Sequence, residues 1–365
     1  MTGQALRLGI PKGSLEEATL AVFHKVGLQF TGSSRSLWLN SNDPEILPVM
    51  LRPQEIPVYV ESGRLDAGLA GLDWIVERDV EQRVVLLAKL QYSKQTSKPI
   101  RWVLAVPDQM KVDSIDDLRV LCEERGIRGE RQFTIATELT RVSNLWLARN
   151  GIDAQAEFSW GATEAKAGYF ADAVIEATET GSSLRANGLR IVADVFTSRT
   201  QFFANKDAYR LDAWKREKLD GLAHLLIGAL RAEDLVQLTV VGEHEVSLED
   251  VLPPEARIVT SVSPAGHSSF HAIVTLPKSS IPYVLPAVIA RGASDAWVST
   301  LDIHYTKAAA EVQPERKQYG APKRVSMSPQ GIRMDRLGAQ RPESVSLASD
   351  VKAGFAKNPK ELPAK

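Results

Sequence analysis

The chain has 365 residues, and its 44 Lys and Arg against 45 Asp and Glu leave a formal net charge of −1 at pH 7. This length is enough for two or three domains with sizeable cores. The near-zero charge argues against a nucleic acid or a membrane surface as the main partner, and we expect neither.

Cysteine content and the N-terminus point to the compartment. The single cysteine, Cys122, excludes an intramolecular disulfide and is typical of a reducing cytosol. No apolar run reaches the roughly 18 residues of a membrane span. The first residues enter a strand directly, without the regions of a signal peptide. The sequence therefore predicts a soluble, cytoplasmic protein.

The first elements form a strand, a turn and a helix. Residues 6–11 predict a strand, and residues 15–26 predict a helix with one apolar face. The turn between them carries Lys12, Gly13 and Ser14. Such a turn is well placed for an anion, although a plain strand-to-helix turn explains the same residues more simply.

Two further strands are predicted at 36–40 and 46–51, followed by a block from Arg52 to Asp73. Pro53 can open a helix, and residues 66–73 form a short strand of small residues. The guanidinium of Arg52 fits a phosphate, with a surface ion pair as the alternative. Asp73 is expected to cap the next helix.

The next segments suggest a second lobe. Strands are predicted at 84–90 and 101–107, separated by a polar hinge or loop at 92–99, and strand and helix alternate from there to about Leu184. Such alternation predicts a parallel α/β sheet. We assign residues 1–95 and 189–210 to the first lobe and 96–188 to the second.

Two segments of the second lobe carry candidate site residues. Thr137 follows a predicted strand and can cap a helix that runs to about Asn150, which leaves Arg141 available for phosphate. Glu164 lies in the run Trp160-Gly-Ala-Thr-Glu-Ala165. It can make a polar contact in a site or serve as a first-turn acid of a helix.

The segment 172–189 carries the strongest functional pattern. A short buried strand at 173–175 is followed by Glu176 and Glu179, and then by hydroxyls around Gly181. Helix starts attract anions, and the hydroxyls of Thr180, Ser182 and Ser183 can donate to phosphate oxygens. The acids can hold ribose hydroxyls or a Mg²⁺ ion. A capped helix with a solvated acidic first turn is the alternative.

Several of these motifs resemble those of the ATP phosphoribosyltransferase family. The family pattern Asp-Ala-Ile-Val-Asp, two residues, Glu-Thr-Gly-x-Thr-Leu matches residues 172–184, with Glu176 and Ser183 as conservative replacements. The Arg52–Asp73 block and the Pro-Lys-Gly turn at 11–13 also match. Ser14 stands where the family has Arg, and the family's Ile-Ala-Thr…Leu-Thr-Arg segment is shorter here, at 135–141.

The resemblance implies a fold and a reaction. The fold is a two-lobed, periplasmic-binding-protein-like α/β core, and the reaction transfers the phosphoribosyl group of phosphoribosyl pyrophosphate (PRPP) to N1 of ATP with the aid of Mg²⁺. The implied catalytic residues are Glu176, Glu164 and Lys12, and the implied metal ligands are Glu176 and Glu164. PRPP would contact Glu176, Glu179, Thr180, Gly181, Ser182, Ser183 and Leu184. ATP would contact Lys12, Gly13, Arg52, Asp73 and Arg141.

The remainder predicts a third domain and a tail. We assign residues 211–306 to a linker helix and a third domain. The linker helix at about 211–231 precedes strands and helices in the order β-α-β-β-α-β, the ferredoxin-like plan, with its first helix at 247–251. Residues 275–278 and 291–298 resemble the C-terminal regulatory domain of the family's long form. That domain implies histidine as an inhibitor, and the family implies a homo-oligomer, from dimer to hexamer.

Other residues of this region receive no ligand role. His267 and His271 are interpreted as structural or surface residues rather than metal ligands. The basic segment 307–365 is predicted to be disordered, with a basic interaction tail as the alternative. The alternative function for the whole chain is a non-catalytic small-molecule binding or regulatory protein on the same two-lobed fold.

Overall fold

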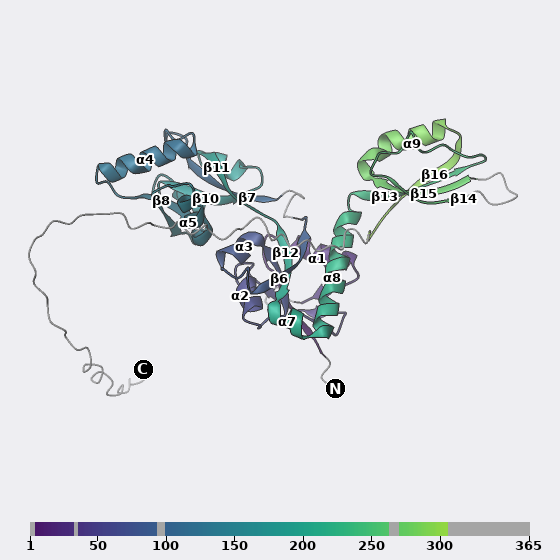
Figure 1. The fold of residues 1–365 in the computed structure, drawn as a ribbon, viewed down its shortest axis with the longest axis horizontal. Helices are drawn as coiled ribbons and strands as arrows, with labels where there is room; N and C mark the ends of the chain where they lie inside the picture. Colours follow the sequence, from purple (N-terminus) through teal and green to yellow (C-terminus); the bar gives the residue numbers. More distant parts are fainter. Residues whose placement is uncertain (1–3, 33–35, 93–98, 263–269, 306–365) are drawn as a thin grey trace, which may run out of the picture. The chain divides into compact units, whose positions relative to one another are not determined.

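The computed structural model describes residues 4–32, 36–92, 99–262 and 270–305 (Figure 1). The predicted hinge at 92–99 falls outside these residues except for its two end positions. His267 and the whole predicted tail at 307–365 also lie outside them. Within the described ranges, no helix has the length and apolar character needed to cross a bilayer.

The first lobe is built on a five-stranded sheet. Its spatial order is β4 (Ile46–Leu51), β1 (Leu6–Pro11), β5 (Ala67–Gly71), β12 (Thr200–Asn205) and β6 (Val84–Leu90). Both β4 and β5 run parallel to β1, so these three strands end at the same edge of the sheet. The turns that follow them therefore bring Lys12, Arg52 and Asp73 to one edge.

Helices cover both faces of this sheet. Helices α1 (Glu16–Lys25) and α8 (Ala213–Ala232) share one core cluster with β1, and α2 (Ile56–Glu61) and α3 (Leu72–Glu77) cover the other face. The short α7 (Lys206–Leu211) precedes α8. Leu219, Leu222 and Leu226 of α8 are buried in the first lobe's core, so the helix predicted as a linker is an integral part of this lobe.

The second lobe contains a second five-stranded sheet. Its order is β11 (Leu189–Ser198), β7 (Ile100–Pro107), β10 (Ala173–Thr178), β8 (Phe133–Thr137) and β9 (Ala154–Phe158). The helical segments around it are α4 (Ile115–Ile127), α5 (Thr140–Arg149), α6 (Ser182–Ala186) and the 3₁₀ turn η1 (Thr163–Lys166). Two α/β sheets confirm the predicted two-lobed core. The expected parallel sheet is wrong in this lobe, because β7 runs antiparallel to both β10 and β11.

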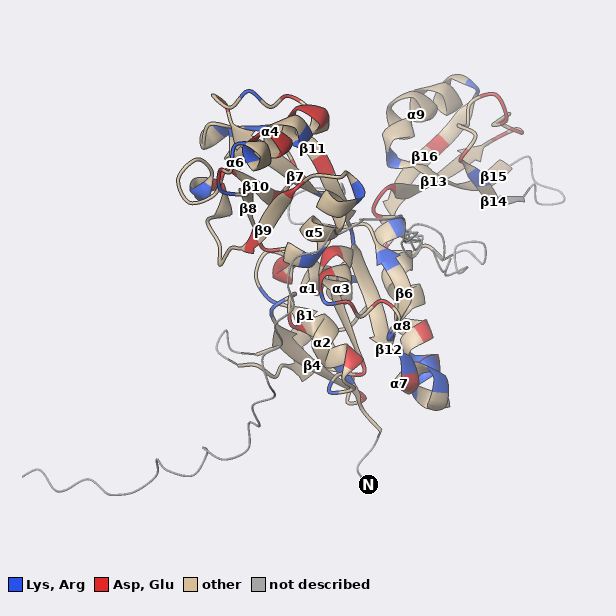
Figure 2. Ribbon diagram, turned by 60° about the vertical axis from the view of Figure 1, so that its left-hand side comes forward, with Lys and Arg blue, Asp and Glu red and all other residues tan. Residues whose placement is uncertain are grey.

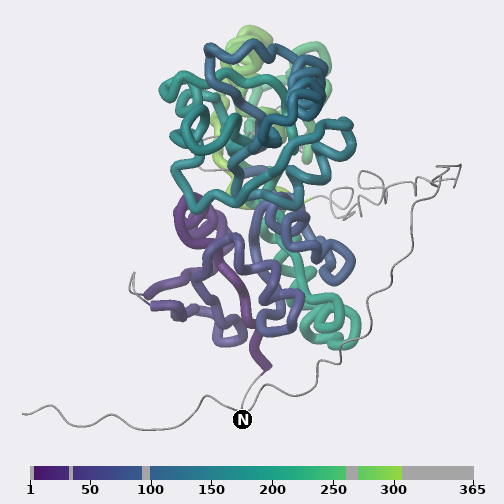
Figure 3. The backbone as a smooth tube through the Cα atoms, turned by 90° about the vertical axis from the view of Figure 1, so that its left-hand side faces the viewer, coloured from purple at the N-terminus to yellow at the C-terminus, as the bar shows by residue number. Residues whose placement is uncertain are grey.

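The chain crosses between the sheets twice, as the colours of Figure 3 trace from purple to blue and back to teal. The return comes later than we expected. Residues 189–198 form β11, which pairs with β7 of the second sheet, and the chain rejoins the first sheet only at β12. The predicted boundary at Leu189 is therefore wrong, because β11 is an edge strand of the second lobe.

A third sheet follows α8. Its order is β14 (Arg257–Val262), β15 (Phe270–Pro277), β13 (Leu235–Gly242) and β16 (Ala293–Thr300), all antiparallel, with η2 (Lys278–Ser280) and α9 (Ile281–Ala290) between β15 and β16. This is the strand order of the ferredoxin-like plan. His271 is exposed on β15.

One predicted element is absent from the described residues, and another is much shorter than expected. The segment 247–251 forms no helix, although Val246 and Leu248 still pack on the third sheet. Pro253 and Pro254 follow at once and cannot continue a helix, which leaves too few residues for one. The strand expected at 36–40 is reduced to β3 (Asn40–Ser41), which pairs with β2 (Phe30–Thr31), and to a single bridge at Trp38.

Candidate active site

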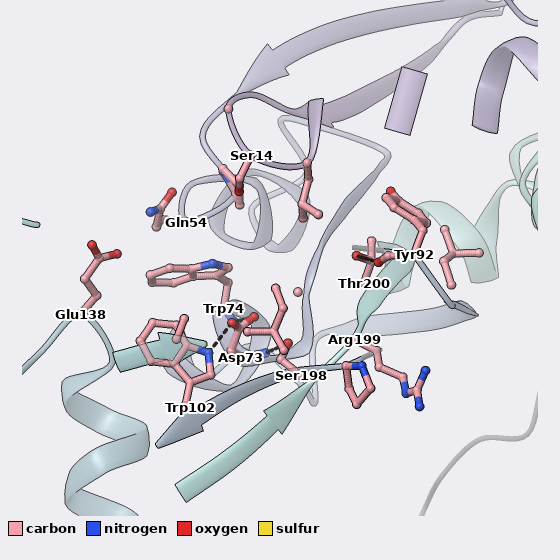
Figure 4. A pocket seen from close by; sticks show the side chains of 18 of the residues that line it. Ser14, Gln54, Asp73, Trp74, Tyr92, Trp102, Glu138, Ser198, Arg199 and Thr200 are labelled. Carbon is pink, nitrogen blue, oxygen red and sulfur yellow. Dashed lines mark hydrogen bonds between the residues drawn. The ribbon is translucent and has the colours of Figure 1, made fainter. Parts of the chain in front are cut away.

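A cavity of about 460 Å³ lies where the edges of the first two sheets meet (Figure 4). The first lobe contributes the turns after β1, β4 and β5, and the second contributes the ends of β8 and β10 and the start of β7. Its lining includes Lys12, Gly13, Ser14, Leu15, Arg52, Pro53, Gln54, Asp73, Trp74, Tyr92, Trp102, Glu138, Glu176, Ser198, Arg199 and Thr200. Clefts at the carboxyl ends of strands are the usual ligand sites of α/β folds.

The wall from the first lobe is cationic and exposed. Lys12 and Gly13 lie in the turn between β1 and α1, and Gly13 has a φ of +95°, a conformation that favours glycine. The backbone N–H of Lys12 donates to the carbonyl of Leu51 at 2.7 Å, which holds the ends of β1 and β4 together. Arg52 is exposed, and no hydrogen bond or ion pair of its guanidinium occurs among the described residues. Its charge is available to an anion.

The wall from the second lobe is acidic. Glu176 on β10 and Glu138 just beyond β8 both line the cavity, and β8 and β10 are neighbouring parallel strands. Burial raises the pKa of Glu176 to about 7. A hydrogen bond from Thr163 opposes this shift, and the like charges of Glu138 and Glu164 add to it. A cation at this carboxylate would offset the crowding of negative charge, and a sugar hydroxyl would donate a hydrogen bond to its charged form.

Asp73 joins the two walls at the base of the cavity. Its side chain is only 4% exposed, and its Oδ2 accepts a hydrogen bond from the indole N–H of Trp102 at 2.7 Å. Its backbone N–H donates to Ser198 Oγ at 3.2 Å. Both partners belong to the second lobe. Burial raises the pKa of Asp73 in spite of these bonds.

The expected capping role of Asp73 is wrong. The N-cap position of α3 is Gly71, which has no side chain to cap the helix, and Asp73 lies inside the first turn. Asp73 lines the cavity, but its two oxygens already accept bonds from Trp102 and from the Trp74 N–H at 3.0 Å. Its contact with ATP stays a prediction.

Two tryptophans form the apolar part of the cavity. The rings of Trp74 and Trp102 meet edge to face, with centroids 6.2 Å apart (Figure 4). Tyr92 is buried nearby and its hydroxyl lies 2.8 Å from that of Thr19. We did not predict these aromatic residues. Trp74 and Trp102 lie in an apolar helix and strand whose patterns equally suit a core position, and Tyr92 was assigned to the polar hinge at 92–99.

The hydroxyl-rich loop lies just beyond Glu176 and outside the cavity lining. Thr180, Ser182 and Ser183 are exposed, while Gly181 is buried with a φ of +74°. The N–H of Gly181 donates to Thr178 Oγ1 at 2.7 Å, so that N–H is already used. Because α6 has only five residues, the exposed hydroxyls rather than a helix dipole would bind an anion.

The remaining residues of this loop divide between the site and the core. Glu179 is half-buried near the end of the strand, and Leu184 is buried in the second lobe's core. Leu184 therefore anchors the loop rather than presenting a polar group to a ligand. Of the predicted PRPP contacts, Glu176 on β10 lines the cavity, and the loop residues 179–184 that follow do not.

Glu164 is adjacent to this loop. It lies on η1, and its carboxylate accepts a hydrogen bond from Ser183 Oγ at 3.3 Å. Among the described residues, no three acidic, histidine or cysteine side chains converge as a metal site would require. Mg²⁺ usually keeps several waters and takes one or two carboxylates together with substrate phosphates. The pair Glu164 and Glu176 fits that smaller role.

Arg141 is placed elsewhere. Its guanidinium donates to the carbonyl of Val76 and forms an ion pair with Asp79, both on the first lobe, and it does not line the cavity. The predicted capping role of Thr137 is also wrong. Helix α5 begins at Thr140, and the Thr137 hydroxyl accepts a hydrogen bond from the N–H of Leu139 at 3.0 Å, before the helix starts.

Comparisons with known proteins agree with the sequence motifs. A family model described as HisG: ATP phosphoribosyltransferase matches residues 52–228. The ATP phosphoribosyltransferase of Pelotomaculum thermopropionicum is 44% identical over 293 residues, which is 80% of this chain and 96% of that protein. The ATP phosphoribosyltransferase of Desulforudis audaxviator is 45% identical over the same fractions.

The chain belongs to the ATP phosphoribosyltransferase family. It is an enzyme of the first step of histidine biosynthesis, and the alternative of a non-catalytic binding protein is set aside. Among solved structures, the ATP phosphoribosyl transferase (HisG:HisZ) complex from Thermotoga maritima contains a similar chain. The match covers 60% of this chain and 96% of that chain, with 27% sequence identity and a TM-score of 0.49.

Proposed function

We propose that the cavity is the place where a phosphoribosyl group passes from PRPP to N1 of ATP, with release of pyrophosphate. The observation that carries this assignment is the opposition of an exposed cationic wall, Lys12 and Arg52, to the acidic edge at Glu176. Both substrates are polyanions with ribose hydroxyls, so they need cations and hydrogen-bond acceptors on facing sides.

In this proposal the substrates divide between the two walls. The 5-phosphate of PRPP lies on the hydroxyls of Thr180, Ser182 and Ser183, and its ribose hydroxyls face Glu176. Lys12 and Arg52 bind the diphosphate or the nucleotide phosphates. Ser14 leaves that turn without the family's arginine, and Arg52 supplies a cation at the same sheet edge.

The chemistry needs alignment and charge stabilisation more than proton transfer. N1 of adenine is already a nucleophile, and the anomeric carbon passes through an oxocarbenium-like state as pyrophosphate leaves. A carboxylate near the ribose stabilises the developing positive charge, and cations stabilise the leaving group. Mg²⁺, held mainly by the diphosphate and by Glu176 or Glu164, would neutralise further charge.

The third domain is proposed to bind histidine as a feedback inhibitor, which makes this chain a long-form, homo-oligomeric enzyme of the cytoplasm. The support is the four-stranded order β14-β15-β13-β16 after α8, the strand order of the regulatory plan expected from the sequence.

Helix α8, which precedes this domain, is attached to the first lobe. Lys215 and Lys218 of α8 form ion pairs with Asp66 and Asp43, and Figure 2 colours such lysines blue and such acids red.

The test is a transfer assay with ATP, PRPP and Mg²⁺ that follows the absorbance of the adduct, with and without histidine. We expect turnover, loss of turnover in Glu176→Ala and Gly181→Val, and inhibition by histidine. Unchanged turnover in both variants would reject the site. Lack of inhibition at any histidine concentration would reject the regulatory proposal alone.

A further inference from the structure

The start of helix α5 is occupied by a side chain of the other lobe. The sequence predicted that Arg141, in the first turn of this helix, would be available for a phosphate. Instead, the backbone N–H groups of Arg141 and Val142 donate to Oε1 and Oε2 of Glu77, each at 3.0 Å. The Thr140 hydroxyl donates to the same carboxylate at 3.1 Å. Glu77 is the last residue of α3, so a first-lobe carboxylate caps a second-lobe helix.

A second set of contacts joins the same two helix ends. The guanidinium of Arg141 bonds the carbonyl of Val76 and pairs with Asp79, at the C-terminal end of α3. The carbonyl end of α3 thus meets a cation, and the positive end of the α5 dipole meets an anion. These two charge-assisted contacts form what we call the α3–α5 clasp: Glu77 and Val76 with Thr140, Arg141 and Val142.

Apolar packing supports the clasp. Val76 is 5% exposed and belongs to the same core cluster as Val142 and Leu139 of the second lobe, although α3 follows a strand of the first sheet. At the other end of α3, Asp73 bonds Trp102 of the second lobe. Helix α3 is therefore attached to the second lobe at both of its ends, and Glu77 does not line the cavity.

The clasp bears on the reaction through the residues that precede α5. Glu138 lies two positions before Thr140 and lines the cavity. It follows directly on β8, whose Thr137 pairs with Ile175, the neighbour of Glu176 on β10. A shift of the α5 start would therefore move the acidic wall relative to Lys12 and Arg52. An error of about 1 Å in such alignment can cost up to roughly 100-fold in rate.

We propose that Glu77 is a positioning residue for phosphoribosyl transfer: by capping α5 from the first lobe, it holds the acidic wall of the cavity opposite the cationic wall. The proposal rests on the proposed function of the cavity. A purely local role, in which the cap only stabilises α5, is the competing explanation. The two differ in what happens to turnover by protein that is fully folded.

The experiment compares full-length wild type with Glu77→Ala, Glu77→Gln and Glu124→Gln. Glu124 is an exposed acid on α4 whose carboxylate pairs with Arg128 of the same lobe, so its variant is the matched control. We would measure kcat and both KM values on protein with a wild-type melting profile, together with amide exchange at Arg141 and Val142. The first turn of α4, capped by its own Ser114, serves as the internal exchange standard.

Positioning predicts that kcat falls while substrate affinity is largely kept, because the binding groups of each lobe remain. We expect kcat of Glu77→Ala to fall about 10- to 100-fold, with KM values within about threefold and faster exchange at the two amides. Glu77→Gln keeps one acceptor and should recover part of the loss. A cycle with Thr140→Ala should be non-additive, since both act on one contact.

Two results would overturn the proposal. In the first, kcat per folded molecule of Glu77→Ala stays within twofold of wild type although its α5 amides exchange faster, which would leave the cap a purely local role. In the second, Glu124→Gln loses as much turnover as Glu77→Ala, which would make the effect unspecific. If the wild type itself does not catalyse transfer, the proposed function of the cavity is wrong. This result differs from the other two, because both of them require an active wild type.

Discussion

The two walls of the cavity are built by different means. The first-lobe wall consists of exposed turns after parallel strands, and its cations Lys12 and Arg52 stay in contact with solvent. The second-lobe wall places Glu176 on a strand, where burial raises its pKa to about 7. Solvent screens exposed cations, whereas a partly buried carboxylate interacts strongly with whatever faces it. Changes to the acidic wall should therefore affect transfer more than changes to the cationic wall.

The largest effect is expected for Glu176→Gln. The amide keeps the size of the side chain and removes the charge that faces the ribose, so kcat should fall about 100-fold or more. Steady-state kinetics of the folded variant provides the measurement. Glu157→Gln, which removes an exposed acid on β9, is the control and should stay near wild type. Equal losses in both variants would mean that the acidic wall has no special role.

A smaller effect is expected for the loop beyond this strand. Gly181→Ala puts a side chain at a φ of +74° and brings its Cβ to 3.2 Å from Ile191 Cδ1. Strain of about 1–2 kcal/mol should shift the loop and raise the KM for PRPP roughly tenfold. Gly188→Ala has a similar φ of +65° in open space and should cost stability without changing this KM. The loop assignment fails if the two variants have the same KM.

On the cationic wall, Arg52→Gln should raise KM for the anionic substrates about fivefold, because an exposed charge contributes a modest, screened interaction. The wild-type KM should also rise with salt, and the variant should respond less. Kinetics at two ionic strengths tests both points. Lys111→Gln, an exposed lysine outside the cavity, is the control. If the salt response of Arg52→Gln equals that of wild type, Arg52 does not face the substrates.

The smallest effect on transfer is expected for Asp66→Asn, which lies away from the cavity. Asp66 is 2% exposed and accepts from Arg7 Nη2 and Lys215 Nζ, each at 2.9 Å. Burial alone would raise its pKa, but the hydrogen bonds from Arg7 and Lys215 outweigh burial and lower it. The variant should keep turnover within twofold and lose about 2 kcal/mol of stability at neutral pH.

The pH dependence of this loss follows from the lowered pKa of Asp66. Its carboxylate stabilises the fold fully above the unfolded pKa of about 4, and this stabilisation disappears as pH falls through the lower folded value. The difference in melting temperature between wild type and Asp66→Asn should thus shrink below about pH 4. A difference that is constant from pH 7 to pH 3 would show that the charge of Asp66 is not responsible.

Local patterns predicted much of the two-lobed core. The strand–turn–helix units that contain Lys12 and Glu176 are encoded by neighbouring residues. The local sequence was therefore enough to predict that Lys12 and Glu176 lie near the ends of strands. The edge strand β11 was harder to assign, because its pairing with β7 is interrupted by two register shifts and is not visible in the local pattern.

Contacts between distant segments could not be predicted. The bond from Trp102 to Asp73 joins residues 29 positions apart and depends on how the two sheets meet. The same holds for Glu77 at the start of α5, where the sequence suggested a cap by Thr137 and a phosphate contact for Arg141. A helix start attracts an anion, but only the fold determines whether that anion is a substrate or a carboxylate of the chain itself.

The most direct test of the account is photolabelling of the full chain with 8-azido-ATP in the presence of PRPP and Mg²⁺, followed by identification of the modified peptides. The account predicts label within the cavity lining, in peptides that contain residues 12–15, 52–54, 71–74, 99–102 or 198–200, and protection by excess ATP. Protectable label confined to the third sheet, residues 235–300, would contradict it.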